Sequence, residues 1–407
     1  MPNRILLSLI MICGILFAMG SKAEPSESAE ADIKAVINGN NQFCLNLYRS
    51  LGQKEPGNIF YSPFSITSAL VMIFEGARGW VESEMQQVFQ FPDDKKVCQD
   101  AFYKLYKSLN KKDAKYKLNI ANDLWVHKDY KLLDTYLKTI EKYYGGKATS
   151  LDFVGSAENA RQTINKWVEQ KTNNKIKDLL PSGSIRPTTR LIITNAIYFK
   201  GIWVKQFDKK LTREEDFWVN ETETVKVPMM RRTDPEAIFN YTELEDLQIL
   251  ELDYEGDDLS MIILLPRDKT LDKLEKELST EKLAEWKNAL SKRRVEVYIP
   301  RFTFTTRYDL TVNLSELGMP NAFAPHCDLS GIDGTKNLYI QSVVHQAFVD
   351  VNEAGTEAAA ATGVVVGITS VGPQIPVFRA DHPFVFVIHD KPTGNILFIG
   401  RVVKPEA

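Results

Sequence analysis

The sequence predicts an α+β fold that forms a single domain. Segments with strand periodicity and segments with helix periodicity are mixed along the chain, without the regular β-α alternation of a doubly wound sheet. No internal repeat or linker divides the 407 residues, although a chain of this length is also compatible with two or three domains. Hydrophobic residues make up 44% of the chain, enough for one large core, and the net charge of -3 implies no general attraction to nucleic acid.

The N-terminus has the pattern of a cleaved secretory signal. A basic residue precedes an apolar run over residues 5–18, and small residues stand at Ala18, Gly20, Ser21 and Ala23. The run is short for a membrane span, so we expect cleavage after Gly20 or Ala23 and a secreted protein, with an uncleaved anchor as the alternative. Residues 1–23 are therefore assigned to the signal and residues 24–407 to the folded domain. No other segment is long and apolar enough to cross a bilayer, so we expect no membrane partner.

Most of the predicted helices lie in the first half of the chain. Apolar residues recur at helical spacing over residues 31–51 and predict an amphipathic helix. The pair Ser62-Pro63 is typical of an N-cap followed by proline in the first turn, and the helix that it begins is apolar nearly all round, which predicts burial. Two further helices are expected over residues 132–144, where two glycines follow, and over residues 156–172.

Strand patterns separate these helices and dominate the second half. Residues 118–126 predict a strand. Residues 190–199 form a nearly continuous β-rich run, as expected of a central strand covered on both faces. Further strands are expected at residues 224–231, 247–252, 259–265, 294–305 and 339–351. A charged helix is expected over residues 271–290. The closing runs, 383–389 and 395–403, predict a hairpin.

The cysteines do not indicate a disulfide framework or a metal site. Cys13 leaves with the signal, and the others, Cys44, Cys98 and Cys327, are scattered without metal-ligand spacing. Because three is an odd number, at least one thiol is free or pairs between chains. Cys44 lies on a helical apolar pattern, which favours a buried filler over a reactive thiol.

The sequence contains no recognisable enzyme motif. It has no G-x-S-x-G elbow, no H-E-x-x-H, no phosphate-binding glycine loop and no EF-hand pattern. The histidines lie apart from one another, at His127, His326, His345, His382 and His389. We therefore expect no catalytic site, metal or cofactor, although a triad assembled from distant residues is defined by geometry and stays open.

Residues 353–370 fit no single template of secondary structure. They lie between two strand-like runs, contain no proline and only two charges, and are therefore unlike a disordered linker. Read with period two, one side of the segment holds small uncharged residues: Thr356, Ala358, Ala360, Thr362, Val364 and Val366. The other side holds Glu357, which suits a water-facing position. The pattern predicts a loop that is able to become a central strand over a packed core.

This segment resembles the hinge of the serpin family, the serine protease inhibitors. The matching residues are Glu353, Gly355, Thr356, Glu357, Ala358, Ala359, Ala360 and Ala361. Other family-like motifs occur in the family's order: residues 58–65, residues 194–203 ending in Trp203, His345, residues 381–384 and residues 399–405. The resemblance covers roughly everything after residue 30. It implies a single-domain fold with three β-sheets, surrounding helices and an exposed reactive-centre loop over about residues 353–376.

The resemblance also implies a mechanism, suicide inhibition. A target protease would cleave the loop and form an acyl-enzyme, and the freed segment would insert into the main sheet and trap the protease covalently. The family register places the reactive bond at Thr369-Ser370. A neutral, β-branched Thr369 favours elastase-like, subtilisin-like or papain-like cysteine proteases over trypsin-like ones. We expect such an inhibitor to be a monomer.

A second function class shares the same fold. Non-inhibitory relatives act as carrier, storage or scaffold proteins, and they tend to carry bulky, charged or proline residues in the hinge. The small residues at Thr356 and at positions 358–361 favour the inhibitor.

By resemblance, Ser62 and Ser65 lie beneath the main sheet where its strands must part, and plain helix capping is the alternative. Asn195 interrupts a predicted buried strand and needs hydrogen-bond partners. The resemblance places it near His345, whereas the alternative is that Asn195 ends its strand at a sheet edge.

Surface features leave two further expectations open. The lysine-rich segment 95–117 resembles a helix that binds sulfated polysaccharide in some serpins, although acidic neighbours also fit an ordinary solvated surface. The sequons at Asn220, Asn240 and Asn313 are possible glycosylation sites.

Overall fold

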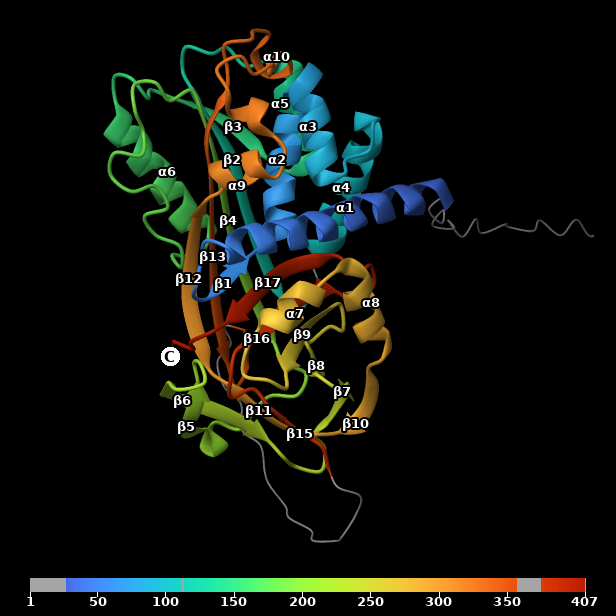
Figure 1. The fold of residues 1–407 in the computed structure, drawn as a ribbon. Helices are drawn as coiled ribbons and strands as arrows, with labels where there is room; N and C mark the ends of the chain where they lie inside the picture. Colours follow the sequence, from blue (N-terminus) through green and yellow to red (C-terminus); the bar gives the residue numbers. More distant parts are fainter. Residues whose placement is uncertain (1–26, 112, 357–374, 407) are drawn as a thin grey trace, which may run out of the picture.

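The computed structural model describes residues 27–111, 113–356 and 375–406, so the predicted signal lies outside the described residues. The described α-helices (Figure 1) are α1 (Glu27–Gly52), α2 (Pro63–Gly76), α3 (Gly79–Phe89), α4 (Lys95–Leu109), α5 (Asp134–Tyr144), α6 (Ala157–Lys171), α7 (Asp272–Glu277), α8 (Thr280–Asn288), α9 (Thr311–Glu316) and α10 (Ser330–Asp333). Two short 3-10 helices are η1 (Lys209–Leu211) and η2 (Pro320–Phe323).

The described strands are β1 (Ile59–Tyr61), β2 (Lys117–His127), β3 (Lys147–Leu151), β4 (Leu191–Ile202), β5 (Arg213–Trp218), β6 (Thr224–Arg232), β7 (Ile238–Glu243), β8 (Leu247–Asp253), β9 (Leu259–Pro266), β10 (Ser291–Arg294), β11 (Glu296–Pro300), β12 (Phe302–Asp309), β13 (Ile340–Asn352), β14 (Gly355–Thr356), β15 (Val377–Arg379), β16 (Phe384–Asp390) and β17 (Ile396–Val402).

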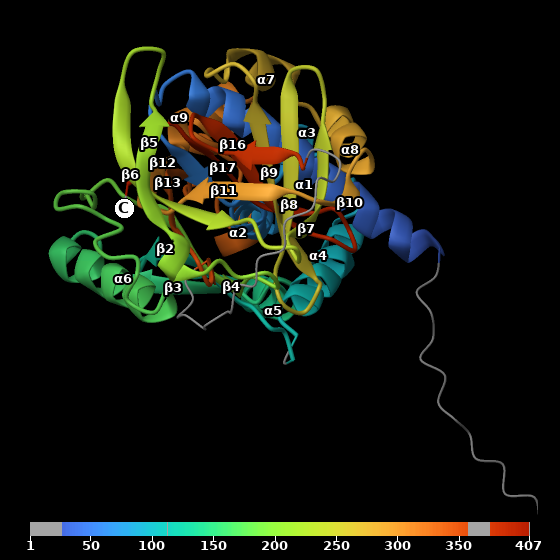
Figure 2. The same cartoon turned by 90° about the horizontal axis from the view of Figure 1, so that it is seen from below.

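These strands form three sheets, which confirms the predicted α+β architecture. The main sheet has six strands in the order β12-β13-β14-β4-β2-β3. The second sheet has seven strands in the order β1-β17-β16-β9-β8-β7-β10, and the small sheet has four in the order β15-β11-β6-β5. Figure 2 shows β8, β9, β16 and β17 of the second sheet side by side, and α6 on the outside of the molecule.

The main sheet lies between two cores. On one face, Ile164 and Val168 of α6 pack against Trp125 and Ile192 of the sheet. On the other face, α2 packs against the sheet together with the second sheet, and Figure 1 shows α6 and α2 on opposite sides. Every residue of α2 except Glu75 is buried, as its apolar sequence predicts. The nearly continuous run predicted at residues 190–199 forms β4, which is covered on both faces, and this confirms the predicted central strand.

Two predicted elements are divided in the structure. The charged helix expected over residues 271–290 is two helices, because Leu278 leaves the helical conformation and the Ser279 hydroxyl accepts a hydrogen bond from the Lys282 N–H at 3.2 Å, which begins α8. The single strand expected over residues 294–305 was also wrong. Its residues belong to β10, β11 and β12, which lie in the second, small and main sheets, respectively. Tertiary pairing decides that division, and Pro300, which lacks an N–H, ends β11.

Cys44, Cys98 and Cys327 are free thiols in the described structure, and all three are buried. Burial raises the pKa of Cys98 and of Cys327 to about 12, so both thiols stay protonated at neutral pH. This agrees with the prediction that disulfides do not hold the fold together. Among the described residues, no helix is both long enough and apolar enough to cross a membrane.

Candidate functional site

The start of the predicted hinge is already a strand of the main sheet. Strands β13 and β4 pair in parallel up to Phe348 and Tyr198. Beyond that point β14 lies between them, with Thr356 opposite Val351 of β13 and Gly201 of β4. Strands β13 and β4 are therefore paired directly along most of their length and are separated by two residues of the hinge at their C-terminal ends.

Two glycines allow this close approach. A Cβ atom on Gly355 would overlap the carbonyl oxygen of Gly201, and a Cβ atom on Gly201 would overlap the ring of Tyr254. A larger residue at Gly355 would push β14 away from β4, and one at Gly201 would displace the Tyr254 ring that contacts the hinge. The glycine in the family-like hinge motif thus has a steric reason to be there.

Thr356 enters the sheet with its side chain toward the core, as its place in the period-two pattern predicts. It is 1% exposed, and its hydroxyl lies 2.8 Å from the hydroxyl of Tyr254. The ring of Tyr254 stacks on Trp203, with centroids 4.4 Å apart and planes at 19°. Burial raises the pKa of Tyr254, so its phenol stays neutral and available for this hydrogen bond.

Trp203 holds the backbone on the other side of the hinge. Its indole N–H donates to the carbonyl of Asn352 at 3.1 Å, and its backbone N–H donates to the carbonyl of Ala354 at 3.0 Å. The indole is buried. Trp203 and Tyr254 together form a rigid aromatic wall against which the hinge is fixed.

Glu353 anchors the hinge through a buried carboxylate. One carboxylate oxygen accepts a hydrogen bond from the Thr212 hydroxyl at 2.8 Å. The other oxygen accepts no hydrogen bond from the described residues, and the Nε of Arg301 lies 3.8 Å away. The carboxylate is 2% exposed, so its charge depends on this arginine for compensation.

A polar cluster ties the main sheet to the start of α2, at the part of β13 and β4 that lies N-terminal to the hinge contacts. The side-chain amide of Asn195 donates to the carbonyl and to the hydroxyl of Ser65, both at 2.7 Å. Asn122 of β2 donates to the same carbonyl at 3.2 Å. Asn195 also hydrogen-bonds the Nδ1 of His345, whose Nε2 accepts from the Ser62 N–H at 3.2 Å.

The protonation state of His345 follows from these contacts. Its Nε2 is an acceptor, so the proton is on Nδ1 and is donated to the side-chain oxygen of Asn195. Burial lowers the pKa of His345 to about 3, so the ring is neutral. A neutral ring, bonded at both nitrogens, links β13 to β4 and to α2 at a single point.

The structure shows how Ser62 and Asn195 are held, and it contradicts the sheet-edge alternative for Asn195. Ser62 does cap α2, since its hydroxyl accepts from the Ser65 N–H at 3.1 Å, but its own N–H belongs to the His345 cluster. Asn195 does not end a strand at a sheet edge. It lies within β4, between Asn122 of β2 and His345 of β13.

Comparison with known proteins identifies the fold family. A family model described as Serpin (serine protease inhibitor) matches residues 38–405. The chain belongs to the serpin family. An uncharacterised serpin-like protein of Methanosarcina acetivorans is 43% identical to this serpin over 373 residues, 91% of this chain and 86% of that protein. The bovine leukocyte elastase inhibitor is also 43% identical, over 376 residues that cover 90% of this chain and 98% of the inhibitor.

Solved serpin structures agree with the fold. Human thyroxine-binding globulin, crystallised in complex with thyroxine, superimposes with a TM-score of 0.84 at 30% identity and covers 92% of this chain and 100% of that one. The similar proteins thus include some that are named as inhibitors and one that is named for binding thyroxine.

Several predicted site residues of this serpin lie outside the described residues. They are the reactive bond at Thr369 and Ser370 and the hinge residues Glu357, Ala358, Ala359, Ala360 and Ala361. The described hinge residues Glu353, Gly355 and Thr356, and the predicted sheet-opening residues, come together as two neighbouring contact sets along β4 and β13. Their roles in sheet opening stay a prediction.

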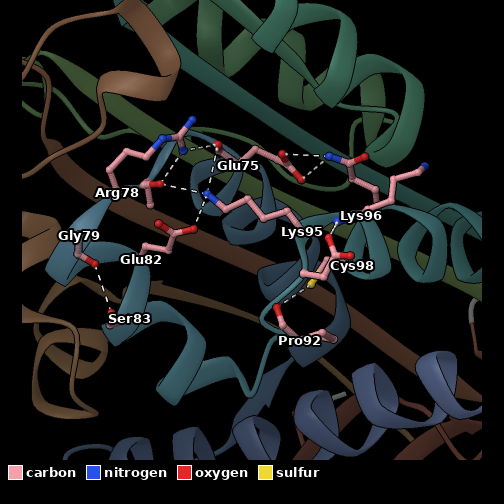
Figure 3. Close-up of polar contacts among 12 residues, drawn as sticks. Glu75, Arg78, Gly79, Glu82, Ser83, Pro92, Lys95, Lys96 and Cys98 are labelled. Atoms are coloured by element: carbon pink, nitrogen blue, oxygen red, sulfur yellow. Dashed lines mark hydrogen bonds and ion pairs between the residues drawn. The ribbon is translucent and has the colours of Figure 1, made fainter.

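The lysines expected to bind polyanions are in part engaged within the serpin fold. Figure 3 shows Lys95 of α4 directed toward Glu82, which its Nζ contacts at 2.8 Å. The same Nζ donates to the carbonyl of Ala77 at 3.0 Å. Burial lowers the pKa of Lys95. Lys96 pairs with Asp100 on the same helix. Polyanion binding by this segment stays a prediction, with the solvated surface as its alternative.

The three sequons differ in exposure. Asn220 is exposed in the turn between β5 and β6. Asn240 is half-buried in β7 and donates to Glu251 at 2.7 Å, and Asn313 is buried in α9 and donates to Ser50 at 2.9 Å. A glycan therefore fits Asn220 best, and glycosylation stays a prediction.

The sequence did not point to four residues of this site: Asn122, Thr212, Tyr254 and Arg301. Asn122 carried a usable signal, because it is a polar residue within a predicted strand, as Asn195 is. The other three gave none. They reach the hinge from distant parts of the chain, and local periodicity does not report such contacts.

Proposed function

We propose that this serpin inhibits proteases as a suicide substrate, by inserting its cleaved loop into the main sheet. The observation that supports the proposal most directly is Thr356, which already lies between β13 and β4 with its side chain buried and hydrogen-bonded to Tyr254. The loop of an inhibitor has to enter the sheet at this place, and here the entry is begun.

The register of β14 supports the next steps. If β14 were extended in the same register, each residue after Thr356 would face the next residue toward the N-terminal end of both β13 and β4. The inward series would then bring Ala358 between Phe199 and Val349, which are buried, and later Thr362 between Asn195 and His345. Small apolar residues suit the first position, because the space between two packed strands tolerates little volume. A threonine hydroxyl suits the position between Asn195 and His345, because a strand inserted there would break the hydrogen bond between these two residues. The hydroxyl of Thr362 can both donate and accept a hydrogen bond in its place.

Insertion also has a sufficient driving force. A strand bonded on both edges adds ladder hydrogen bonds of about 0.5–1.5 kcal/mol each, together on the order of 10 kcal/mol. About thirteen inserted residues at ~3.3 Å would move the attached protease roughly 43 Å. The intact protein is then a kinetically trapped state, and cleavage releases it.

The finer features of the proposal come from the sequence. The reactive bond is Thr369-Ser370, the targets are elastase-like, subtilisin-like or papain-like cysteine proteases, and the target is bound covalently. The name of the bovine relative, leukocyte elastase inhibitor, agrees with a small or apolar specificity. A secreted monomer with residues 1–23 removed, a glycan at Asn220 and weak polyanion binding at residues 95–117 complete the proposal.

A protease panel tests this function. The mature protein is incubated with elastase-like, subtilisin-like, papain-like and trypsin-like enzymes, and complexes that resist SDS are sought. The C-terminal fragment that each reaction releases is identified by mass. A fragment that begins at Ser370, together with a stable complex, is the expected result. Cleavage without any complex across the whole panel would contradict inhibition.

Carriage of a small molecule is the second candidate function, and one cavity favours it. A hollow of about 580 Å³ lies between α1, α8 and the second sheet. Ile262 and Val387 form part of its apolar wall, and Lys287 and Asn41 supply polar groups. Its volume is within the range of pockets for drug-sized ligands. A serpin that fails to trap any protease but retains an extracted hydrophobic ligand through gel filtration would be a carrier.

A further inference from the structure

A second, smaller cavity lies directly behind the hinge. It has a volume of about 260 Å³ and is enclosed by the end of β4, by β7 and β8, and by the edge strand β10. Figure 1 shows β7, β8 and β10 together at the lower right of the molecule. The inner wall includes Trp203, the residue that holds Asn352 and Ala354 of the hinge.

The wall of this cavity is apolar and aromatic. Trp203, Phe239 and Leu252 are buried and form its floor. At its mouth stand two large apolar side chains that are unusually exposed, Val204 at 55% and Ile238 at 45%. Exposed apolar side chains grouped around a concave surface favour contact with an apolar body.

The charges at the rim are mostly positive. Lys205 donates to the carbonyl of Glu236 at 3.0 Å, which leaves its charge without a carboxylate. Lys292 is exposed on β10 and forms no ion pair with any residue that the structure describes. The acidic residue of the lining, Asp253, pairs with Lys391 at 2.8 Å, and the same ammonium group also pairs with Asp257. The rim therefore presents two uncompensated ammonium groups beside an aromatic floor.

From this arrangement we infer that the cavity behind Trp203 is a binding site for a small aromatic anion, and that its occupant controls the mobility of the hinge. The aromatic body packs on Trp203 and Phe239, and its acidic group lies between Lys205 and Lys292. A ring packed against the indole restrains it in the position from which it donates to Asn352. The ligand thus stabilises the hinge as it stands and opposes further parting of β13 and β4.

Binding is tested on the intact full-length protein without any protease. The probe is 2-naphthalenesulfonate, titrated by calorimetry, with neutral 2-naphthol as the comparison ligand. In the double variant Lys205→Ala/Lys292→Ala we expect the sulfonate to bind at least about tenfold more weakly. The matched control is Lys138→Ala/Lys166→Ala, which removes the same charge from exposed positions on α5 and α6 and should bind as the wild type does. Absence of binding, equal loss in both variants, or equal affinity for 2-naphthol would overturn the site.

The link to the hinge has its own readout. Hydrogen exchange of the peptide that contains Trp203 reports the N–H that donates to Ala354. A saturating probe should slow that exchange at least about fivefold in the wild type and leave it unchanged in the Lys205→Ala/Lys292→Ala variant. Unchanged exchange in the wild type would show that the site does not act on the hinge.

The expected consequence for trapping rests on the proposed function. The probe should lower the ratio of covalent complex to cleaved protein for the wild type and not for the pocket variant. If no protease is trapped at all, the proposed function fails, whereas calorimetry and hydrogen exchange still decide this inference.

Discussion

The hydroxyl oxygen of Thr356 lies 2.8 Å from that of Tyr254 and joins the hinge to the turn after β8. Both side chains are buried, so the bond is shielded from water. The contact requires Thr356 to lie within the main sheet, so variants that remove it test how strongly the start of the hinge is held there.

The strength of this bond is measurable by a double-mutant cycle. Tyr254→Phe and Thr356→Val each leave the other hydroxyl without its partner, so each should destabilise the intact protein by about 1–2 kcal/mol. The double variant should lose less than the sum, with a coupling energy of about 0.5–1.5 kcal/mol in urea unfolding. A parallel cycle that pairs Tyr254→Phe with Thr163→Val on exposed α6 should show no coupling. Equal coupling in both cycles would contradict the bond.

Charge at the first inward position should convert the inhibitor into a substrate. Thr356 already lies between β13 and β4 in the intact protein, so Thr356→Arg brings a guanidinium into the core at the place where insertion has begun. This costs several kcal/mol unless the side chain bends back to water, and a displaced hinge has to start insertion again against that cost. The ratio of covalent complex to cleaved protein should drop at least about tenfold, because deacylation of the protease continues at its own rate. Glu357→Arg, on the outward side of the pattern, is the matched control and should still trap. Similar ratios for the two variants would argue against strand insertion.

Specificity should follow residue Thr369. Thr369→Arg supplies the cation that a trypsin-like pocket binds, so the variant should form SDS-stable complexes with trypsin, which the wild type should not. The hinge is unchanged, and trapping should be as efficient as with the natural target. If trypsin ignores the variant or cuts it at another bond, Thr369 is not the residue that the protease reads.

Asp123 should make stability depend on pH near neutrality. Burial between β2, β3 and α6 raises the pKa of this carboxyl to about 7, and one of its oxygens has no hydrogen-bond partner within the described residues. Because the folded pKa lies above the unfolded value of 3.8, folding favours the protonated form, and the associated stability is lost as pH rises toward and through about 7. Relative to the wild type, Asp123→Asn should therefore gain stability between pH 5 and pH 8, by about 1–3 kcal/mol.

Urea denaturation of both proteins at the two pH values measures this difference. The positive charges that act on Asp123 come from Lys147 of β3 and Lys171 of α6. A difference between the variant and the wild type that is the same at both pH values would show that Asp123 is ionised throughout.

Sequence reasoning predicted those parts of the fold that local pattern determines. The buried helix after Ser62 and the central strand around Asn195 followed from nearly continuous apolar runs, because such runs require an element that is covered on all sides. The break at Ser279 and the division at Pro300 were missed, since a capping hydroxyl or a change of sheet leaves the alternation of neighbouring residues nearly intact.

The residues of the functional site also differ in whether a sequence pattern could predict them. His345 and Asn195 were expected together only because motifs of a family order them, and the same holds for Trp203. Tyr254 was not expected at all, although it touches the first inserted side chain. Its contact joins residues that are 102 positions apart in the chain, and single-sequence patterns do not encode such distances.

The two-residue strand β14 changes which step limits the rate of the proposed insertion. Starting a strand is its costliest stage, because backbone freedom is lost before many ladder hydrogen bonds form. In this chain the start is complete, since Gly355 and Thr356 are paired on both edges. In the proposed mechanism, insertion after cleavage of the loop only has to extend a strand that already exists. Its rate is then set by how readily β13 and β4 separate beyond the hinge. The hydrogen bonds of His345 to Asn195 and to Ser62 hold β13 to β4 and to the start of α2 at that point and would have to break.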